Sequence, residues 1–169
     1  TIDILKLKVD ILGIKLEIID INKLNINEMD YKNVFGIMTQ YPNIEGDIEL
    51  SYMDKLNNID ILKSCSTDLM SLVKLKSPGE LGFDIAFGNS QRFGVPLWYG
   101  GPHPAFLAID KKLMRLLPGK IVGKTIDLLN NEVYRLALQT REQHIRKDNA
   151  TSNICTSQSL LTNVVSLYT

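Results

Sequence analysis

Two segments of this 169-residue sequence carry polar residues in an order that simple packing does not require. The first runs through Ser90-Gln91-Arg92-Phe93-Gly94-Val95-Pro96 and continues to Tyr99-Gly100-Gly101-Pro102-His103. The second runs from Gln139 to Thr156 and includes Arg141, His144, Arg146, Thr151, Asn153 and Cys155. Arginine binds carboxylate and phosphate groups through two parallel hydrogen bonds. The second segment is therefore a candidate site for an anionic substrate, cofactor or carrier protein.

The basic residues of the second segment do not share one helical face. Only positions three or four apart are neighbours on a helix, so Arg141, His144 and Arg146 indicate an extended or turning segment. These side chains could hold an external carboxylate or phosphate. The alternative is an intramolecular ion-pair network with Glu142 and Asp148, because charge networks often serve structure alone. The sequence leaves both interpretations open.

Glycine and proline dominate the end of the first segment, where Gly94, Pro96, Gly100, Gly101, Pro102 and Pro104 follow one another closely. Such a stretch cannot form a regular helix or an inner strand, so it predicts a stiff, shaped loop. Glycine lets the backbone approach a ligand or a neighbouring subunit closely. Tyr99 and His103 are then candidate interface residues. A tight connector between two strands is the alternative.

A metal centre is not predicted. The sequence has two histidines, His103 and His144, and they lack the spacing of a ligand pair. The two cysteines, Cys65 and Cys155, are too few for a zinc cluster or a disulfide framework. Cys155 lies near a predicted helix start, where the helix dipole lowers a thiol pKa, so it is a candidate redox thiol. A plain buried thiol is the alternative.

The composition is that of a folded globular protein. Hydrophobic residues make up 44% and charged residues 22%, and 19 basic residues balance 19 acidic ones. A neutral chain has no broad attraction for nucleic acid or an anionic membrane. No apolar run approaches the roughly 18–20 residues of a membrane span. Because the chain begins at Thr1 and ends at Thr169 within an apolar helical pattern, we expect a single-domain fragment truncated at both ends.

Predicted strands alternate with helices, which indicates an α/β layer architecture. Helical spacing predicts a helix over 2–12 that ends at Gly13, and alternation predicts a half-buried strand over 14–18. We expect a loop over 22–33, strands over 34–39, 59–64, 84–88 and 106–109, a helix over 51–58 and a hairpin tip at 128–132. A final helix is expected to follow the capping residues Thr151, Ser152 and Asn153 and to bury Leu160, Leu161, Val164, Val165 and Tyr168.

At the two polar segments the sequence closely resembles the P-protein of the glycine cleavage system, a pyridoxal-phosphate-dependent glycine decarboxylase. The resemblance extends from Thr1-Ile2-Asp3 to Tyr168. It implies an α/β fold, namely part of the large domain of the aspartate-aminotransferase-like fold (fold type I of the PLP-dependent transferases). P-proteins have two similar halves, and the C-terminal half carries the cofactor lysine in an Asn-Leu-His-Lys type of motif. This chain resembles the N-terminal half.

Laid against that motif, Gln91 stands at the histidine position and Arg92 at the lysine position. A Schiff base needs a neutral amine, whereas a guanidinium stays charged, so Arg92 cannot hold the cofactor covalently. The nearest upstream lysines, Lys74 and Lys76, are expected to be solvated. Two departures from the family stand out: the region between Tyr52 and Asp68 is a few residues short, and Trp98 replaces a small residue.

The resemblance implies decarboxylation of glycine with transfer of the aminomethyl group to the lipoyl arm of the H-protein. It implies that pyridoxal phosphate is held by the catalytic half, with Arg141, His144, Arg146, Thr151, Asn153, Tyr99 and His103 forming an active-site wall or interface. The implied assembly is a homodimer or a two-plus-two heterotetramer, in the bacterial cytoplasm or the mitochondrial matrix. The alternative is a non-catalytic half that stabilises the catalytic half or seats the H-protein. Such a half could come from a degenerating copy of the gene.

Overall fold

The structure is a computed structural model that describes residues 2–20, 30–117, 120–138 and 158–169. The chain divides into two compact units, Thr1–Asn33 and Val34–Thr169. In the first unit, helix α1 (Ile2–Leu12) ends at Gly13, as predicted. Gly13 has a φ of +65°, and the amide of Ile14 donates to the carbonyl of Val9 at 2.9 Å. Glycine adopts this left-handed conformation without steric cost, which explains why the helix stops there.

The expected strand over 14–18 is wrong. Residues 14–20 have no regular secondary structure, and no described strand pairs with them. Alternation of apolar and charged residues does not make a strand unless a neighbour satisfies its backbone hydrogen bonds. The polar segment that follows falls largely outside the described residues, apart from the short 3₁₀ helix η3 (Tyr31–Asn33).

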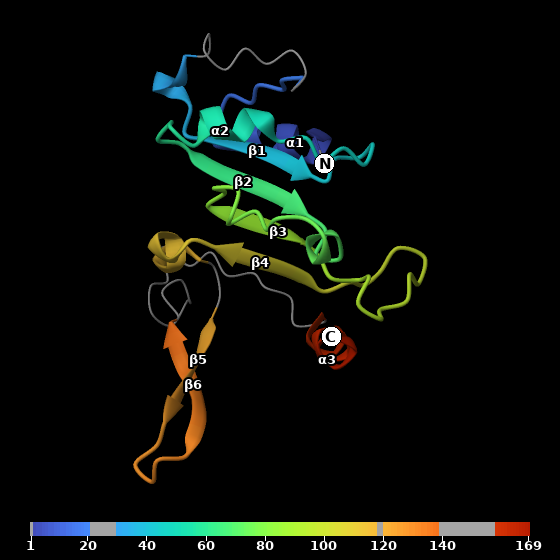
Figure 1. The fold of residues 1–169 in the computed structure, drawn as a ribbon, viewed down its shortest axis with the longest axis vertical. Coiled ribbons are helices and arrows are strands. Elements are labelled where there is room, and N and C mark those ends of the chain that lie inside the picture. The colour runs from blue at the N-terminus through green and yellow to red at the C-terminus, as the bar shows by residue number, and fades with distance from the viewer. Residues whose placement is uncertain (1, 21–29, 118–119, 139–157) are drawn as a thin grey trace. The chain divides into compact units, whose positions relative to one another are not determined.

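The second unit is built on a four-stranded sheet of order β1-β2-β3-β4 (Figure 1). Strands β1 (Gly36–Tyr41), β2 (Leu62–Thr67) and β3 (Ile85–Asn89) run parallel. Strand β4 (Ala105–Ile109) returns antiparallel to β3, with Phe87 opposite Leu107. Three of the four predicted strand ranges lie within two residues of the observed ends, and the one over 59–64 is displaced by three residues.

Helix α2 (Ser51–Leu56) connects β1 to β2 and is close to its predicted range. Its side chains Met53 and Leu56 are buried, so the helix contributes an apolar face to the core. The rest of the buried apolar core comprises Tyr41, Ile61, Cys65, Phe83, Val95 and Leu161. Two 3₁₀ helices, η4 (Ser71–Val73) and η5 (Lys111–Leu116), follow β2 and β4.

A separate two-stranded sheet consists of β5 (Ile121–Ile126) and β6 (Glu132–Leu138). Its turn confirms the predicted hairpin tip, since the amide of Asp127 donates to the carbonyl of Asn131 at 2.9 Å. Helix α3 (Ser159–Tyr168) confirms the final helix, but only Leu161 of its expected apolar face is buried. The expected cap residues Thr151, Ser152 and Asn153 lie outside the described residues.

Two findings concern the described residues as a group. None of their helices is long and apolar enough to cross a membrane. They also contain no cluster of three or more His, Cys, Asp or Glu side chains that could hold a metal ion.

Candidate functional site

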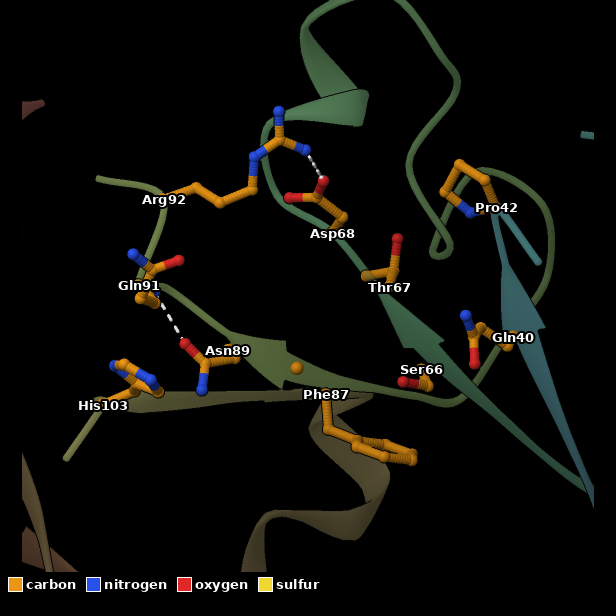
Figure 2. A pocket seen from close by; sticks show the side chains of 11 residues that line it. Gln40, Pro42, Ser66, Thr67, Asp68, Phe87, Asn89, Gln91, Arg92 and His103 are labelled. Atoms are coloured by element: carbon orange, nitrogen blue, oxygen red, sulfur yellow. Dashed lines mark hydrogen bonds and ion pairs between the residues drawn. The ribbon is translucent and has the colours of Figure 1, made fainter. Parts of the chain in front are cut away.

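The second unit has a pocket of about 570 Å³ at one edge of its sheet (Figure 2). Polar side chains predominate in its lining, which comprises Gln40, Pro42, Ser66, Thr67, Asp68, Phe87, Gly88, Asn89, Gln91, Arg92 and His103. The volume is in the usual range for small-molecule sites.

The strand topology explains why these residues meet. The parallel strands β1, β2 and β3 end at Tyr41, Thr67 and Asn89 on one edge of the sheet. Antiparallel β4 begins at that same edge, so the loop over 90–104 stays there. Ligands of open α/β sheets bind at the carboxyl ends of the parallel strands. The pocket therefore occupies the edge where this fold class places its ligands.

Local hydrogen bonds hold the loop that carries Arg92. The hydroxyl of Ser90 is buried and donates to the carbonyl of Pro104 at 2.9 Å, which joins the two ends of the loop. The amide of Gln91 donates to Oδ1 of Asn89 at 2.7 Å, and Nε2 of Gln91 donates to the carbonyl of Val95 at 2.5 Å. The prediction of a loop without regular helix or strand is confirmed, and these bonds hold the backbone from which Arg92 projects.

Arg92 and Asp68 form an ion pair at the pocket, between Nη1 of the guanidinium and Oδ2 of the carboxylate (Figure 2). The Arg92 side chain is 60% exposed and the Asp68 side chain 32% exposed. The second carboxylate oxygen of Asp68 accepts a hydrogen bond from the amide of Met70 at 3.0 Å, which anchors it to the turn after β2. Among the lining residues that the structure describes, the two formally charged side chains therefore neutralise each other.

Two polar atoms of the lining have no hydrogen-bond partner in the part of the chain that the structure describes. They are Oγ1 of Thr67 and Nδ1 of His103, and both atoms are buried. Thr67 is 7% exposed and ends β2. Buried hydroxyl and ring nitrogen atoms are normally paired, so these two atoms could each pair with a polar ligand.

Gly88 allows close packing of the sheet beside the pocket. A Cβ at this position would lie 2.2 Å from the carbonyl oxygen of Thr67 and 2.7 Å from the ring of Phe106. Strand β3 and its neighbours therefore pack more closely at Gly88 than any side chain allows.

The structure places only some of the predicted site residues at the pocket. Arg92 and His103 both line the pocket. Tyr99 does not, because it is fully exposed on the loop over 90–104 with a φ of +54°. Arg141, His144, Arg146, Thr151, Asn153 and Cys155 lie outside the described residues.

Asp68, Thr67, Asn89 and Gln40 were not predicted as site residues. Each lies at or just beyond the carboxyl end of a strand. Polar side chains at such ends of parallel strands are the signal that would have found Gln40 and Asn89, which directly follow the predicted strands over 34–39 and 84–88.

The pocket does not fit covalently bound pyridoxal phosphate. Its described lining contains no lysine, and the guanidinium at the expected lysine position is ion-paired with Asp68. The buried lysine of β2, Lys63, uses its ammonium to donate to the carbonyls of Ile59 and Ile61, both at 3.2 Å. Lys74 and Lys76 are exposed, as predicted, and do not line the pocket.

Comparisons with known proteins agree with this architecture. A family model described as glycine cleavage system P-protein matches residues 1–169. Glycine dehydrogenase (decarboxylating), mitochondrial, of Mus musculus is 55% identical over 146 residues, which cover 84% of this chain and 14% of that protein. The Dictyostelium discoideum protein of the same name is 48% identical over 170 residues, which cover 99% of this chain and 17% of that protein.

A solved structure of a glycine cleavage system P-protein is also similar to this chain. The crystal structure of a glycine decarboxylase (P-protein) of the glycine cleavage system, in inhibitor-bound form, matches with a TM-score of 0.73 and 38% identity. The match covers 80% of this chain and 32% of that one, and it confirms the expected fold class, an α/β part of a fold type I PLP-dependent transferase. The chain spans about one-sixth of the length of its curated relatives. By these matches, the chain belongs to the glycine cleavage system P-protein family.

Proposed function

We propose that this chain is part of a longer P-protein that decarboxylates glycine and transfers the aminomethyl group to the lipoyl arm of the H-protein. The observation that carries the proposal is the family match over all 169 positions, together with relatives named glycine dehydrogenase (decarboxylating). The short span of the chain relative to those proteins supports its being one portion of a single large domain.

We further propose that this portion belongs to the N-terminal half and holds no covalent cofactor. Arg92, ion-paired with Asp68, supports this role. The catalytic C-terminal half or subunit would supply the lysine and hold pyridoxal phosphate, which provides an electron sink for glycine decarboxylation. The proposed assembly is a homodimer of fused halves or a two-plus-two heterotetramer. Because the similar curated relatives are mitochondrial proteins, we place a eukaryotic source in the mitochondrial matrix and a bacterial one in the cytoplasm.

Borohydride reduction tests the division of labour. The full-length P-protein that carries this chain would be reduced in the presence of pyridoxal phosphate, digested and mapped by mass spectrometry. We expect one phosphopyridoxyl-lysine per pair of halves, located outside residues 1–169. A stoichiometric adduct on a lysine of this chain would contradict the assignment to the N-terminal half, and the absence of any adduct would contradict the proposed enzyme.

The second polar segment is proposed as an active-site wall. Arg141, His144 and Arg146 would bind an anionic group of the substrate, the cofactor or the carrier. Loss of a charged hydrogen bond costs about 1.5–3 kcal/mol, which is roughly a tenfold to hundredfold effect on turnover. Arg141→Ala and Arg146→Ala should each lower glycine–bicarbonate exchange by about that factor with an unchanged melting temperature.

The matched control is Arg135→Ala, because Arg135 is an exposed arginine on strand β6. It should leave the exchange rate unchanged. His144→Ala should act like the two arginine variants or more weakly. If all three variants of the segment keep full activity, or lose activity only in step with stability, the segment has a structural role. That result would favour the alternative of a non-catalytic half that stabilises the catalytic half or seats the H-protein.

A further inference from the structure

We propose that the pocket bounded by Arg92, Asp68 and Thr67 binds a small zwitterionic α-amino acid without a covalent cofactor. The inference rests on the proposed function in one respect: it assumes that this chain is part of a full-length P-protein. It concerns what the pocket of this half holds once a covalent cofactor is excluded from it.

The charges of the lining select a zwitterion. The two charged side chains, Arg92 and Asp68, are one cation and one anion that already lie in contact (Figure 2). A free anion would gain Arg92 but meet the carboxylate beside it, and a free cation would meet the guanidinium. An α-amino acid brings a carboxylate and an ammonium group, both attached to one carbon. It can match both side chains and keep the pocket neutral.

The existing ion pair can be opened at little cost. Its arginine is 60% exposed, and exposed ion pairs contribute little to stability because water screens them. The carboxylate is held in place independently, since Oδ1 of Asp68 accepts the amide of Met70. Asp68 therefore stays fixed as an acceptor for the ligand's ammonium while Arg92 turns to the ligand's carboxylate. A guanidinium also has further N–H donors beyond the one that Asp68 uses.

The unpartnered atoms supply the remaining ligand contacts. Thr67 is more than nine-tenths buried, lines the pocket, and has no hydrogen-bond partner for its hydroxyl among the described residues. Nδ1 of His103 is likewise unpartnered in the part of the chain that the structure describes. Leaving such groups buried and unpaired is unfavourable, and a bound carboxylate would pair a hydroxyl or ring N–H directly.

Equilibrium dialysis of radiolabelled glycine tests the proposal. The full-length P-protein is first assayed for cofactor content and exchange activity, and then reduced with borohydride so that the catalytic site is blocked. We expect one glycine bound per copy of this chain. Acetate lacks the ammonium and methylamine lacks the carboxylate, and each should compete at least tenfold more weakly than unlabelled glycine.

Variants locate the site. Arg92→Gln and Thr67→Val should each weaken glycine binding by tenfold or more, while Arg135→Gln, the matched exposed arginine, should leave it unchanged. Thr67→Val preserves side-chain shape, so its loss of binding is not a loss of packing. Circular dichroism confirms that each variant is folded.

Three results would overturn the proposal: no binding to the reduced protein, binding indifferent to Arg92→Gln and Thr67→Val, or acetate competing as well as glycine. The last result would make the pocket an anion site. Failure of the proposed function would appear separately, in the cofactor content and exchange activity measured before reduction.

Discussion

Lys112 and Asp84 form an ion pair of 2.5 Å between residues 28 positions apart, and it ties the helix η5 to the start of β3. The Asp84 carboxylate is buried, and its second oxygen accepts the amide of Lys63 at 2.8 Å. Asp84 therefore connects the starts of β2 and β3 to η5. This end of the sheet is opposite the end that carries the pocket. A buried carboxylate with two partners is costly to unpair.

Asp84→Asn should loosen this part of the sheet. The change keeps the side-chain shape but removes the charge, so we expect a loss of about 1–3 kcal/mol in local stability. Hydrogen exchange with mass spectrometry on β2 and β3 peptides of the full-length protein measures it. The exposed pair Lys124–Glu132, at 2.6 Å, provides the control, and Glu132→Gln should cost about 0.5 kcal/mol or less. Equal effects of the two variants would contradict the special role of Asp84.

The same pair predicts a pH dependence. Burial raises the pKa of Asp84, but the hydrogen bonds from Lys112 and from the Lys63 amide lower it more, so the pKa lies below its ordinary value of 3.8. The folded pKa is therefore lower than the unfolded one. The stabilisation is complete above about pH 4 and is lost as the pH falls through the folded pKa. The difference in exchange between wild type and Asp84→Asn should hold at neutral pH and shrink below about pH 4. A constant difference would contradict the assignment.

Cys65 should resist alkylation in the folded protein. Burial raises the pKa of its thiol to about 11, and the side chain is fully buried. The thiolate is the reactive form, so iodoacetamide at pH 8 should leave Cys65 unmodified until denaturant is added. Peptide mapping reads out the label. Because the unfolded thiol ionises near 9.0, folding stability from this group should fall as the pH rises from 9 toward 11. Rapid labelling of Cys65 under native conditions would show that the site opens.

Trp98 occupies a conformation that favours glycine. Its φ is +40°, that of Tyr99 is +54°, and both side chains are exposed. A bulky residue in this region costs roughly 1–2 kcal/mol. Trp98→Gly should therefore slow proteolytic cleavage of the loop over 90–104, despite the flexibility that glycine adds to the unfolded chain. Faster cleavage in the glycine variant would mean that contacts of the Trp98 ring outweigh the strain.

The isolated chain should self-associate. Large apolar side chains are exposed on the hairpin and on α3, namely Leu128, Leu129, Tyr134, Leu160 and Leu167. Exposed apolar patches and strand edges promote association in water. Light scattering after size-exclusion chromatography of residues 1–169 alone should show species larger than a monomer. A monodisperse monomer with a cooperative melting transition would contradict this expectation.

The pocket shows where sequence reasoning succeeds and fails. The positions of Arg92 and His103 could be anticipated, because dense glycine and proline define their loop. Thr67 and Asp68 could not, because the strand before them was predicted three residues too early. Its apolar run ends at Leu62, whereas the buried face of β2 carries Lys63, Cys65 and Thr67. A strand whose buried face has Cys65 as its one apolar residue between Lys63 and Thr67 gives little apolar signal, so its carboxyl end and the site residues there are missed.

Gly88 has a consequence for natural variation. Every missense change at this position adds at least a Cβ, and that atom would lie 2.2 Å from the backbone oxygen of Thr67. A backbone atom inside a sheet cannot move aside cheaply, unlike the end of a flexible side chain. A substitution of Gly88 would therefore disturb the packing of the sheet before it affected the binding of any ligand. In a population of organisms that depend on this protein, the codon for Gly88 should tolerate synonymous changes and almost no others.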